Sequence, residues 1–355
     1  MARKAQSRKS TRKPARAKAP VRRAKKPFVI DMHTHIRVPA LLDYVKRYPV
    51  KGAIGGEDWF AAGSLANVSG QDTNRWTFLT EPDARLAEMD KQGVDIQIIS
   101  TNFPVTCYYL DPEIGAAAAR ATNDAIAEFC AADNDRFVGI ASVPLQDANV
   151  AAGELERAVK SLGLRGAWIA SNVRARDLGE AEFRPFWAKA EKLGVPVFVH
   201  PLGTTDLSRL TKNFLFNTIG QPLEEAMAMS SLIYGGILDD YPKLEICICH
   251  GGGYLPYYIG RSDHAYRSHP ENQDAAKKRP SAYLTRFWYD TVIFDPDMLP
   301  YLVKKAGANK VMMGSDWPLV RTDAVGYVAR SRAITEDARS RILYRNCAGL
   351  LGISV

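Results

Sequence analysis

The stretch Phe28-Val29-Ile30-Asp31-Met32-His33-Thr34-His35 sets the pattern for the whole chain. Its apolar residues predict a buried strand, with two histidines at the carboxyl end. Similar short apolar runs recur through the sequence. The strands predicted in this way span 28–33, 94–99, 137–143, 166–170, 195–200, 244–250, 287–291 and 310–314. Because most of these runs are apolar on both faces, they are typical of a parallel sheet covered by helices.

Longer amphipathic segments separate the predicted strands. The clearest candidate helices span 83–92, 112–132, 148–162, 181–193 and 222–238. Gly93, Gly163 and Gly194 each come just after such a segment, where glycine commonly ends a helix. Eight strands that alternate with helices favour an α/β fold of the (β/α)8 or TIM barrel type over an open sheet.

Two segments fall outside this alternation. Residues 1–26 contain twelve lysines and arginines and no acid, and they predict a disordered basic tail before a barrel domain over 27–355. The tail either contacts a polyanion or is a solvated extension. The connection over 36–80 is too long for a barrel loop and predicts an insertion after the first strand. It is interpreted as a lid or binding loop, or as a packed decoration or subunit contact.

Composition indicates the cellular compartment and narrows the class of protein. Without the tail, the body carries 35 basic and 39 acidic residues, so the positive net charge says nothing about the catalytic surface. The five cysteines are odd in number and form no CxxC pair, which favours reduced thiols in a cytoplasmic protein. No apolar stretch is long enough for a membrane span, and the basic N-terminus is not followed by the apolar region of a secretory signal.

Five side chains that can bind metal lie at the ends of predicted strands. His33 and His35 follow the first strand, His200 the fifth, His250 the sixth and Asp316 the eighth. In a parallel barrel the carboxyl ends of all strands open on one face, where active sites form. His33 and His35 are two residues apart, so an extended chain places both on one side. Imidazole and carboxylate together suit zinc, and also manganese or iron.

These motifs resemble the amidohydrolase superfamily, of the amidohydrolase 2 type. The resemblance is carried by Asp31–His35, Val199–Pro201, His250–Gly253 and Gly314–Pro318, and it runs from about 28 to 353. Within the superfamily the sequence is most similar to the branch of aminocarboxymuconate-semialdehyde decarboxylase. That branch also contains hydratases, hydrolases and decarboxylases of aromatic acids.

The resemblance implies a role for each motif residue. His33, His35, His200 and Asp316 match metal ligands, and His250 matches an acid/base beside the metal-bound water. Asp316 could also orient that water. Many members carry a carbamylated lysine on the fourth strand that bridges two metals, but residues 166–171 contain no lysine. A single divalent metal is therefore expected, with zinc as the first expectation and manganese as the alternative.

Substrate recognition is less well defined by the resemblance. Arg261 matches an arginine that reaches a neighbouring subunit's site and holds a substrate carboxylate, which implies a homodimer; the alternative is an ordinary surface arginine. A second substrate arginine of the decarboxylase aligns with Thr73, and Arg75 follows two residues later. An aromatic shelf residue falls on Phe214 rather than on tryptophan. These departures leave the substrate open.

The predicted function is metal-dependent decarboxylation of a small unsaturated or aromatic carboxylic acid. It would use a metal-activated water, with His250 as the acid/base. The same site could instead run hydrolysis or hydration of a lactone, an amide or a conjugated double bond. A third class, a polyanion-binding module with a vestigial barrel, is disfavoured by the intact set of ligands.

Overall fold

A computed structural model of the chain describes residues 27–48, 73–101, 108–201 and 209–355. The basic tail over 1–26 and Cys107 lie outside the described residues. Disorder of the tail, its contact with a polyanion and its separation from the domain over 27–355 therefore stay predictions. Within the described part, no helix is long and apolar enough to cross a membrane.

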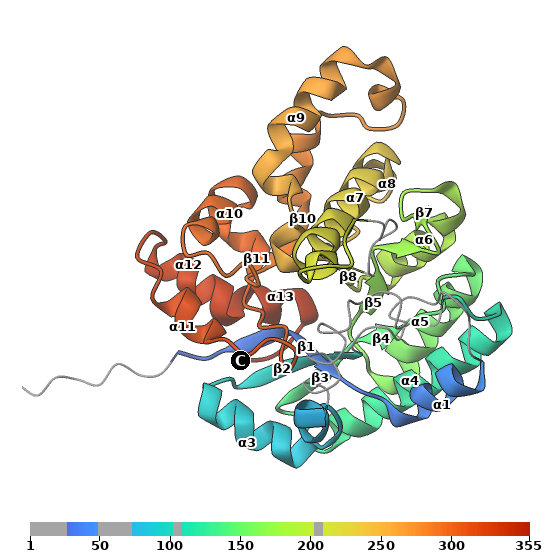
Figure 1. Ribbon diagram of the computed structural model, residues 1–355, viewed down its shortest axis with the longest axis vertical. Coiled ribbons are helices and arrows are strands. Elements are labelled where there is room, and N and C mark those ends of the chain that lie inside the picture. Colours follow the sequence, from blue (N-terminus) through green and yellow to red (C-terminus); the bar gives the residue numbers. More distant parts are fainter. Residues whose placement is uncertain (1–26, 49–72, 102–107, 202–208) are drawn as a thin grey trace, which may run out of the picture.

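Eight parallel strands form a closed barrel, as the sequence predicts (Figure 1). They are β1 (Ile30–Ile36), β2 (Ile96–Thr101), β3 with β4 (Phe137–Gly139 and Ala141–Ser142), β5 (Ala167–Ala170), β8 (Val197–His200), β9 (Ile246–Ile248), β10 (Phe287–Asp290) and β11 (Val311–Met312). β3 pairs with β2 and β4 pairs with β5, so these two short pieces act as one strand. The barrel closes where the Met32 amide donates to the Met313 carbonyl at 2.9 Å and Thr34 pairs with Trp317.

Helices surround the strands, and most of the predicted ones are confirmed. The first half contains α1 (Pro39–Arg47), α3 (Pro82–Gln92), α4 (Pro112–Ala131), α5 (Ala148–Leu162) and α6 (Arg184–Leu193). A 3-10 turn over Ala181–Phe183 precedes α6, and the short hairpin of β6 (Asn172–Val173) and β7 (Arg176–Asp177) follows β5. Gly93, Gly163 and Gly194 end α3, α5 and α6 with positive φ angles of 79°, 72° and 67°, as their positions predict.

The predicted helix over 222–238 is wrong in one respect, because it breaks at two glycines. α7 (Gln221–Tyr234) ends at Gly235, and α8 (Ile237–Asp240) begins after Gly236. A Cβ atom at Gly235 would lie 2.4 Å from the Gly179 carbonyl oxygen, so the backbones of two distant segments touch here. Gly236 has a φ of 72°, which a helix interior does not allow.

The insertion over 36–80 is not a plain loop. α1 occupies its beginning and residues 73–80 are helical, while residues 49–72 lie outside the described part. The helices near the carboxyl end are not among those predicted from the sequence. These are α9 (Leu255–Ser268), α10 (Met298–Ala306), α11 (Ala324–Ala329), α12 (Glu336–Ser340) and α13 (Asn346–Leu351).

Apolar side chains fill the interior of the barrel. Side chains from seven of the strands meet there, and α13 adds three more to the same cluster. The members include Ile30, Met32, Ile96, Ile98, Ile140, Trp168, Phe198, Cys247, Cys249 and Met312 from the strand regions, and Cys347, Ala348 and Leu351 from α13. These side chains exclude water from the interior, so we expect a polar site at the carboxyl ends of the strands.

Candidate metal centre

The two histidines of the first motif lie inside β1, which continues to Ile36. The predicted strand end at 33 is therefore too early, because pairing with β2 and with the segment after β11 extends the strand. Both His33 and His35 are fully buried. Their Nε2 atoms approach each other to 3.1 Å, so the two rings converge as the spacing predicts.

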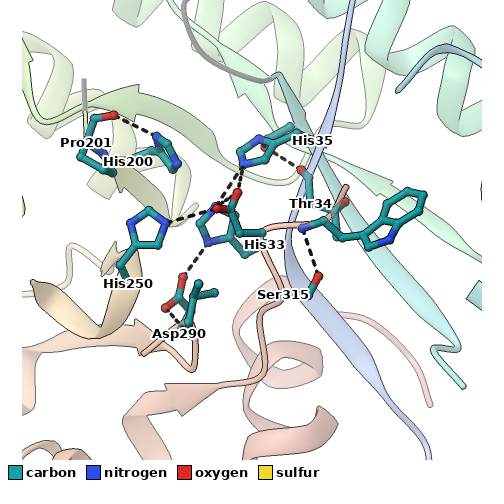
Figure 2. Close-up of polar contacts among 12 residues, drawn as sticks. His33, Thr34, His35, His200, Pro201, His250, Asp290 and Ser315 are labelled. Atoms are coloured by element: carbon teal, nitrogen blue, oxygen red, sulfur yellow. Dashed lines mark hydrogen bonds and ion pairs between the residues drawn. The ribbon is translucent and has the colours of Figure 1, made fainter. Parts of the chain in front are cut away.

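The other three predicted side chains join them from distant parts of the chain, and Figure 2 shows two of them, His200 and His250, beside His33. His200 ends β8, while His250 and Asp316 follow β9 and β11 with left-handed φ angles of 47° and 58°. One donor atom each from His33, His200, His250 and Asp316 lies within 4.8 Å of the others. The Asp316 Oδ1 atom lies 2.9 Å from His35 Nε2, and its Oδ2 atom lies 3.7 Å from His250 Nε2.

All four histidines turn Nδ1 toward an oxygen acceptor. The acceptors are the Asp290 carboxylate for His33 (2.6 Å), the Thr101 carbonyl for His35 (3.2 Å), the Pro201 carbonyl for His200 (3.0 Å) and the Glu225 carboxylate for His250 (2.6 Å). An acceptor requires the proton on the nitrogen that faces it, so each ring in its neutral form carries its lone pair on Nε2. Lone pairs and a carboxylate that converge at these distances repel one another unless a cation lies among them.

The donor set therefore fits a divalent cation. Two nitrogen or oxygen atoms that bind one cation at about 2.1 Å lie roughly 3.0–3.4 Å apart, close to the separations among His33, His35 and Asp316. Burial lowers the pKa of His35 and, together with the neighbouring His250 ring, holds the pKa of His200 well below its usual range. Burial alone would raise the pKa of Asp316, but its contacts with His250 and His35 outweigh this and lower it strongly. Neutral imidazole and ionised carboxylate are the protonation states that bind metal.

Asp290 is a site residue that the sequence analysis missed. It ends β10 and is fully buried. One carboxylate oxygen accepts from His33 Nδ1, and the other accepts from the amides of Gly251 and Val292 at 3.0 Å each. Asp290 thus joins a candidate ligand to the turn that carries His250. The signal for it was its position at the carboxyl end of the seventh predicted strand.

Replacing Asp290 by asparagine is expected to weaken metal binding about 10- to 100-fold, the usual effect of losing a residue that orients a ligand. The side-chain amide of asparagine accepts only through its oxygen. Its NH2 group would therefore face another donor, either His33 Nδ1 or the backbone amides that Asp290 now accepts from. Competition with a chelator would measure the metal dissociation constant. Asp297→Asn, at an exposed position before α10, is the control. Unchanged affinity in Asp290→Asn would show that Asp290 only fills space.

Arg85 of α3 supports the same centre from behind. It is fully buried, and its guanidinium donates to the His35 carbonyl oxygen and lies 4.4 Å from the centre of the Trp317 ring. Its positive charge interacts with the carboxylate of Asp31. That carboxylate accepts a hydrogen bond from the Ser315 amide at 3.0 Å. The segment that carries Asp316 is therefore tied to β1 and α3.

Trp168 lies directly against the histidines. Its ring centre is 5.2 Å, 5.4 Å and 5.3 Å from those of His33, His35 and His200, respectively. It stands on β5, the fourth strand, on which other superfamily members carry the bridging lysine. The indole thus fills space beside the centre with an apolar group.

A cavity of about 480 Å³ opens over His250 and Asp316. Most of its other described lining is apolar or aromatic, and the remaining lining groups are polar and neutral. These lining residues are Asn217, Thr218, Gln221, Pro222, Gly253, Tyr254, Tyr257, Val292, Ile293, Phe294, Met298 and Val320. Such a lining suits a small flat or unsaturated molecule whose charged group faces the metal centre.

The three predicted substrate residues do not line this cavity in the described part of a single chain. Arg261 is exposed on α9 and borders a separate groove with Tyr258 and Lys305. Phe214 has a φ of 60° and packs edge-on against Phe216. Arg75 is half-buried in the helical segment 73–80. Their roles toward a substrate stay predictions.

The chain is similar to known proteins over most of its length. The model of the family described as Amidohydrolase matches residues 30–353. The chain is 31% identical over 332 residues to a 2-amino-3-carboxymuconate-6-semialdehyde decarboxylase of Dictyostelium discoideum, covering 91% of each protein. Two crystal structures are similar in fold. One is a 5-carboxyvanillate decarboxylase from Sphingomonas paucimobilis (TM-score 0.81, 25% identity, 92% of this chain and 99% of that chain). The other is a dihydroxybenzoic acid decarboxylase from a Polaromonas species, with bound manganese and the inhibitor 2-nitroresorcinol (TM-score 0.75, 26% identity, 92% and 97%).

Proposed function

The chain belongs to the amidohydrolase family, and from that premise we propose that it is a metal-dependent decarboxylase of a small aromatic or unsaturated carboxylic acid. The observation that carries the proposal is the convergence of four histidine Nε2 atoms and the Asp316 carboxylate beneath an apolar cavity. The related enzymes named above are all decarboxylases, two of them of aromatic acids by name. Their activity supports the same reaction class here.

We assign His33, His35, His200 and Asp316 as ligands of one divalent cation. The cation would supply positive charge that binds polar groups of the substrate and activates water. Manganese in the related Polaromonas structure supports a divalent metal, and the same donor types also suit zinc. The Trp168 ring supports a single cation, because it occupies space next to the histidines.

Removing the metal is expected to abolish turnover reversibly. Dialysis against a chelator should remove one equivalent per chain, and zinc or manganese added back should restore the rate. Elemental analysis of the loaded protein would give the stoichiometry, and the two metals would be compared at equal occupancy. Two equivalents per chain would contradict the single site, and full turnover without metal would contradict the role of the cation.

Within this proposal, the residues of the chain move one proton. When the bond to the carboxylate breaks, CO2 leaves and the electron pair stays on the carbon, which then needs a proton. His250 borders the cavity and points Nε2 toward Asp316 Oδ2, so it can hold that proton and pass it to the carbon. Burial by itself would lower the pKa of His250, but Glu225 and Asp316 outweigh it and raise that pKa well above its usual range. No redox cofactor is required by this balance.

Mass spectrometry of pooled small carboxylic acids, incubated with the metal-loaded protein, tests the reaction. An acid that loses the mass of CO2 only with the intact protein, and not with Asp316→Asn, would support the decarboxylase and identify its substrate. An acid, lactone or amide that gains the mass of water would overturn the proposal in favour of a hydrolase or hydratase.

We also propose a homodimer in which Arg261 serves the partner's site. Apolar side chains on α7, on α9 and directly before each of these helices are exposed by 37–65%; they are Ile219, Leu223, Met227, Tyr254 and Tyr258. Exposed apolar groups gathered on neighbouring helices favour a partner surface. Arg261 lies one turn after Tyr258, so a second copy bound here would receive its guanidinium.

Arg261→Met is expected to raise KM about tenfold or more, with metal binding unchanged. A monomer at assay concentration, measured by light scattering, would rule out this role.

A cytoplasmic location stays part of the proposal. The four described cysteines, Cys130, Cys247, Cys249 and Cys347, are buried free thiols, which agrees with a reducing compartment. Fractionation of cells that express the chain would test the location.

A further inference from the structure

We propose that Glu225 is a positioning residue that selects which nitrogen of His250 faces the cavity. This inference rests on the proposed function, since it concerns the histidine that moves the proton in that reaction. Sequence motifs did not point to Glu225, which lies 25 positions before His250 within α7.

The contact between the two side chains is direct. The Glu225 Oε1 atom lies 2.6 Å from His250 Nδ1, and Glu225 is fully buried. Its Oε2 atom has no hydrogen-bond partner among the described residues, so His250 is the main polar partner of this carboxylate in that part of the chain. On the other side of the ring, Nε2 lies 3.7 Å from Asp316 Oδ2. The Nδ1 edge of the imidazole therefore contacts Glu225, and the Nε2 edge points toward the metal centre.

A carboxylate restricts the ring in a way that a neutral group does not. An ionised carboxylate can only accept a hydrogen bond, so the proton of neutral His250 must stay on Nδ1. Nε2 is then the nitrogen that gains and loses a proton toward the cavity. An amide at position 225 could accept through its oxygen or donate through its nitrogen, and it would therefore allow both tautomers. The selection depends on the carboxylate, not on the volume of the side chain.

The third glycine of the His250–Gly253 motif makes this contact feasible. Gly253 has a φ of 58°, and a Cβ atom built there would lie 2.1 Å from the Pro222 carbonyl oxygen and 3.1 Å from the Glu225 Cβ atom. A larger residue would therefore push α7 away from the turn. The glycine gives a close approach between α7 and the turn, and this approach brings Glu225 within reach of His250.

The main test reads the tautomer of His250 without any substrate. Protein labelled with 15N histidine and loaded with zinc would be compared as wild type, Glu225→Gln and Glu225→Ala, with the His250→Asn spectrum used for assignment. At a pH above the raised pKa values of both Glu225 and His250, the expected wild-type pattern has a protonated Nδ1 and an unprotonated Nε2. Glu225→Gln should show a mixture of tautomers, although its volume is nearly the same.

Kinetics on the acid found in the mass-spectrometric screen provide the second readout. Glu225→Gln is expected to lower kcat about 10- to 100-fold, with KM and metal stoichiometry unchanged, and Glu225→Ala should lower kcat further. Glu154→Gln is the matched control, because Glu154 is also a buried glutamate (3% exposed) but pairs with Asn123 and Arg157 away from the site. It should leave kcat unchanged.

The outcomes separate the two proposals. A wild-type tautomer pattern and kcat retained in Glu225→Gln would overturn the role of Glu225 while the decarboxylase stands. Equal losses in Glu225→Gln and Glu154→Gln would also overturn it, since they would reflect a general loss of stability. If no acid is decarboxylated but the tautomer shifts in Glu225→Gln, the positioning role holds and the proposed reaction fails.

Discussion

Replacing Asp316 by asparagine is expected to lower kcat on the order of 1,000-fold and to weaken metal binding. The carboxylate faces both His33 and His35 through Oδ1, at 3.5 Å and 2.9 Å, and it is the only anion among the assigned ligands. An amide keeps the shape but removes the charge, and several kcal/mol of lost charge stabilisation correspond to about a thousandfold in rate. Asparagine also tolerates the left-handed φ of 58° at this position, so the backbone should stay in place.

Two measurements distinguish this effect from misfolding. Thermal unfolding without metal should be similar in Asp316→Asn and the wild type, while the stabilisation that metal adds should shrink. Asp323→Asn, seven residues later in an exposed ion pair with Arg330, is the control and should retain full activity. A variant Asp316→Asn with unchanged kcat and metal affinity would remove Asp316 from the ligand set.

Replacing His250 by asparagine is expected to lower kcat about 100- to 10,000-fold, the range for loss of a general acid or base. Metal stoichiometry should stay at one, because the other three histidines and Asp316 remain. Asparagine accepts the φ of 47° at this position, so the turn after β9 should be preserved. Steady-state kinetics together with elemental analysis would separate the proton-transfer role from metal binding.

The exposed His269 offers a matched control. Within the described part of the chain, its ring lies in hydrogen-bond contact with the neighbouring Ser268 hydroxyl, far from the metal-centre residues in sequence, and His269→Asn should leave kcat unchanged. If His250→Asn instead loses its metal, His250 is a ligand and the proton must come from another group. The grouping of His250 with His33, His200 and Asp316 within 4.8 Å makes this a sharp alternative.

Much of the barrel is predictable from local sequence. A buried strand needs an unbroken apolar run, and a helix end needs a residue that accepts a left-handed conformation, so the eight strands and Gly93, Gly163 and Gly194 are visible without a structure. The break at Gly235 is different. It depends on contact with Gly179, 56 positions earlier, and no local pattern reports such a contact.

The candidate ligands were also visible, because strand topology alone brings the carboxyl ends of parallel strands to one face. By itself, the sequence determined that His33, His35, His200, His250 and Asp316 would meet. Only the tertiary structure decided which atoms face inward. The acceptors that orient the rings are carbonyls, Asp290 and Glu225, and Asp290 lies 257 positions from the histidine it contacts. A hydrogen bond of this kind forms only when packed elements are positioned to within a few tenths of an ångström. Positions of that precision leave no periodic pattern in the order of residues.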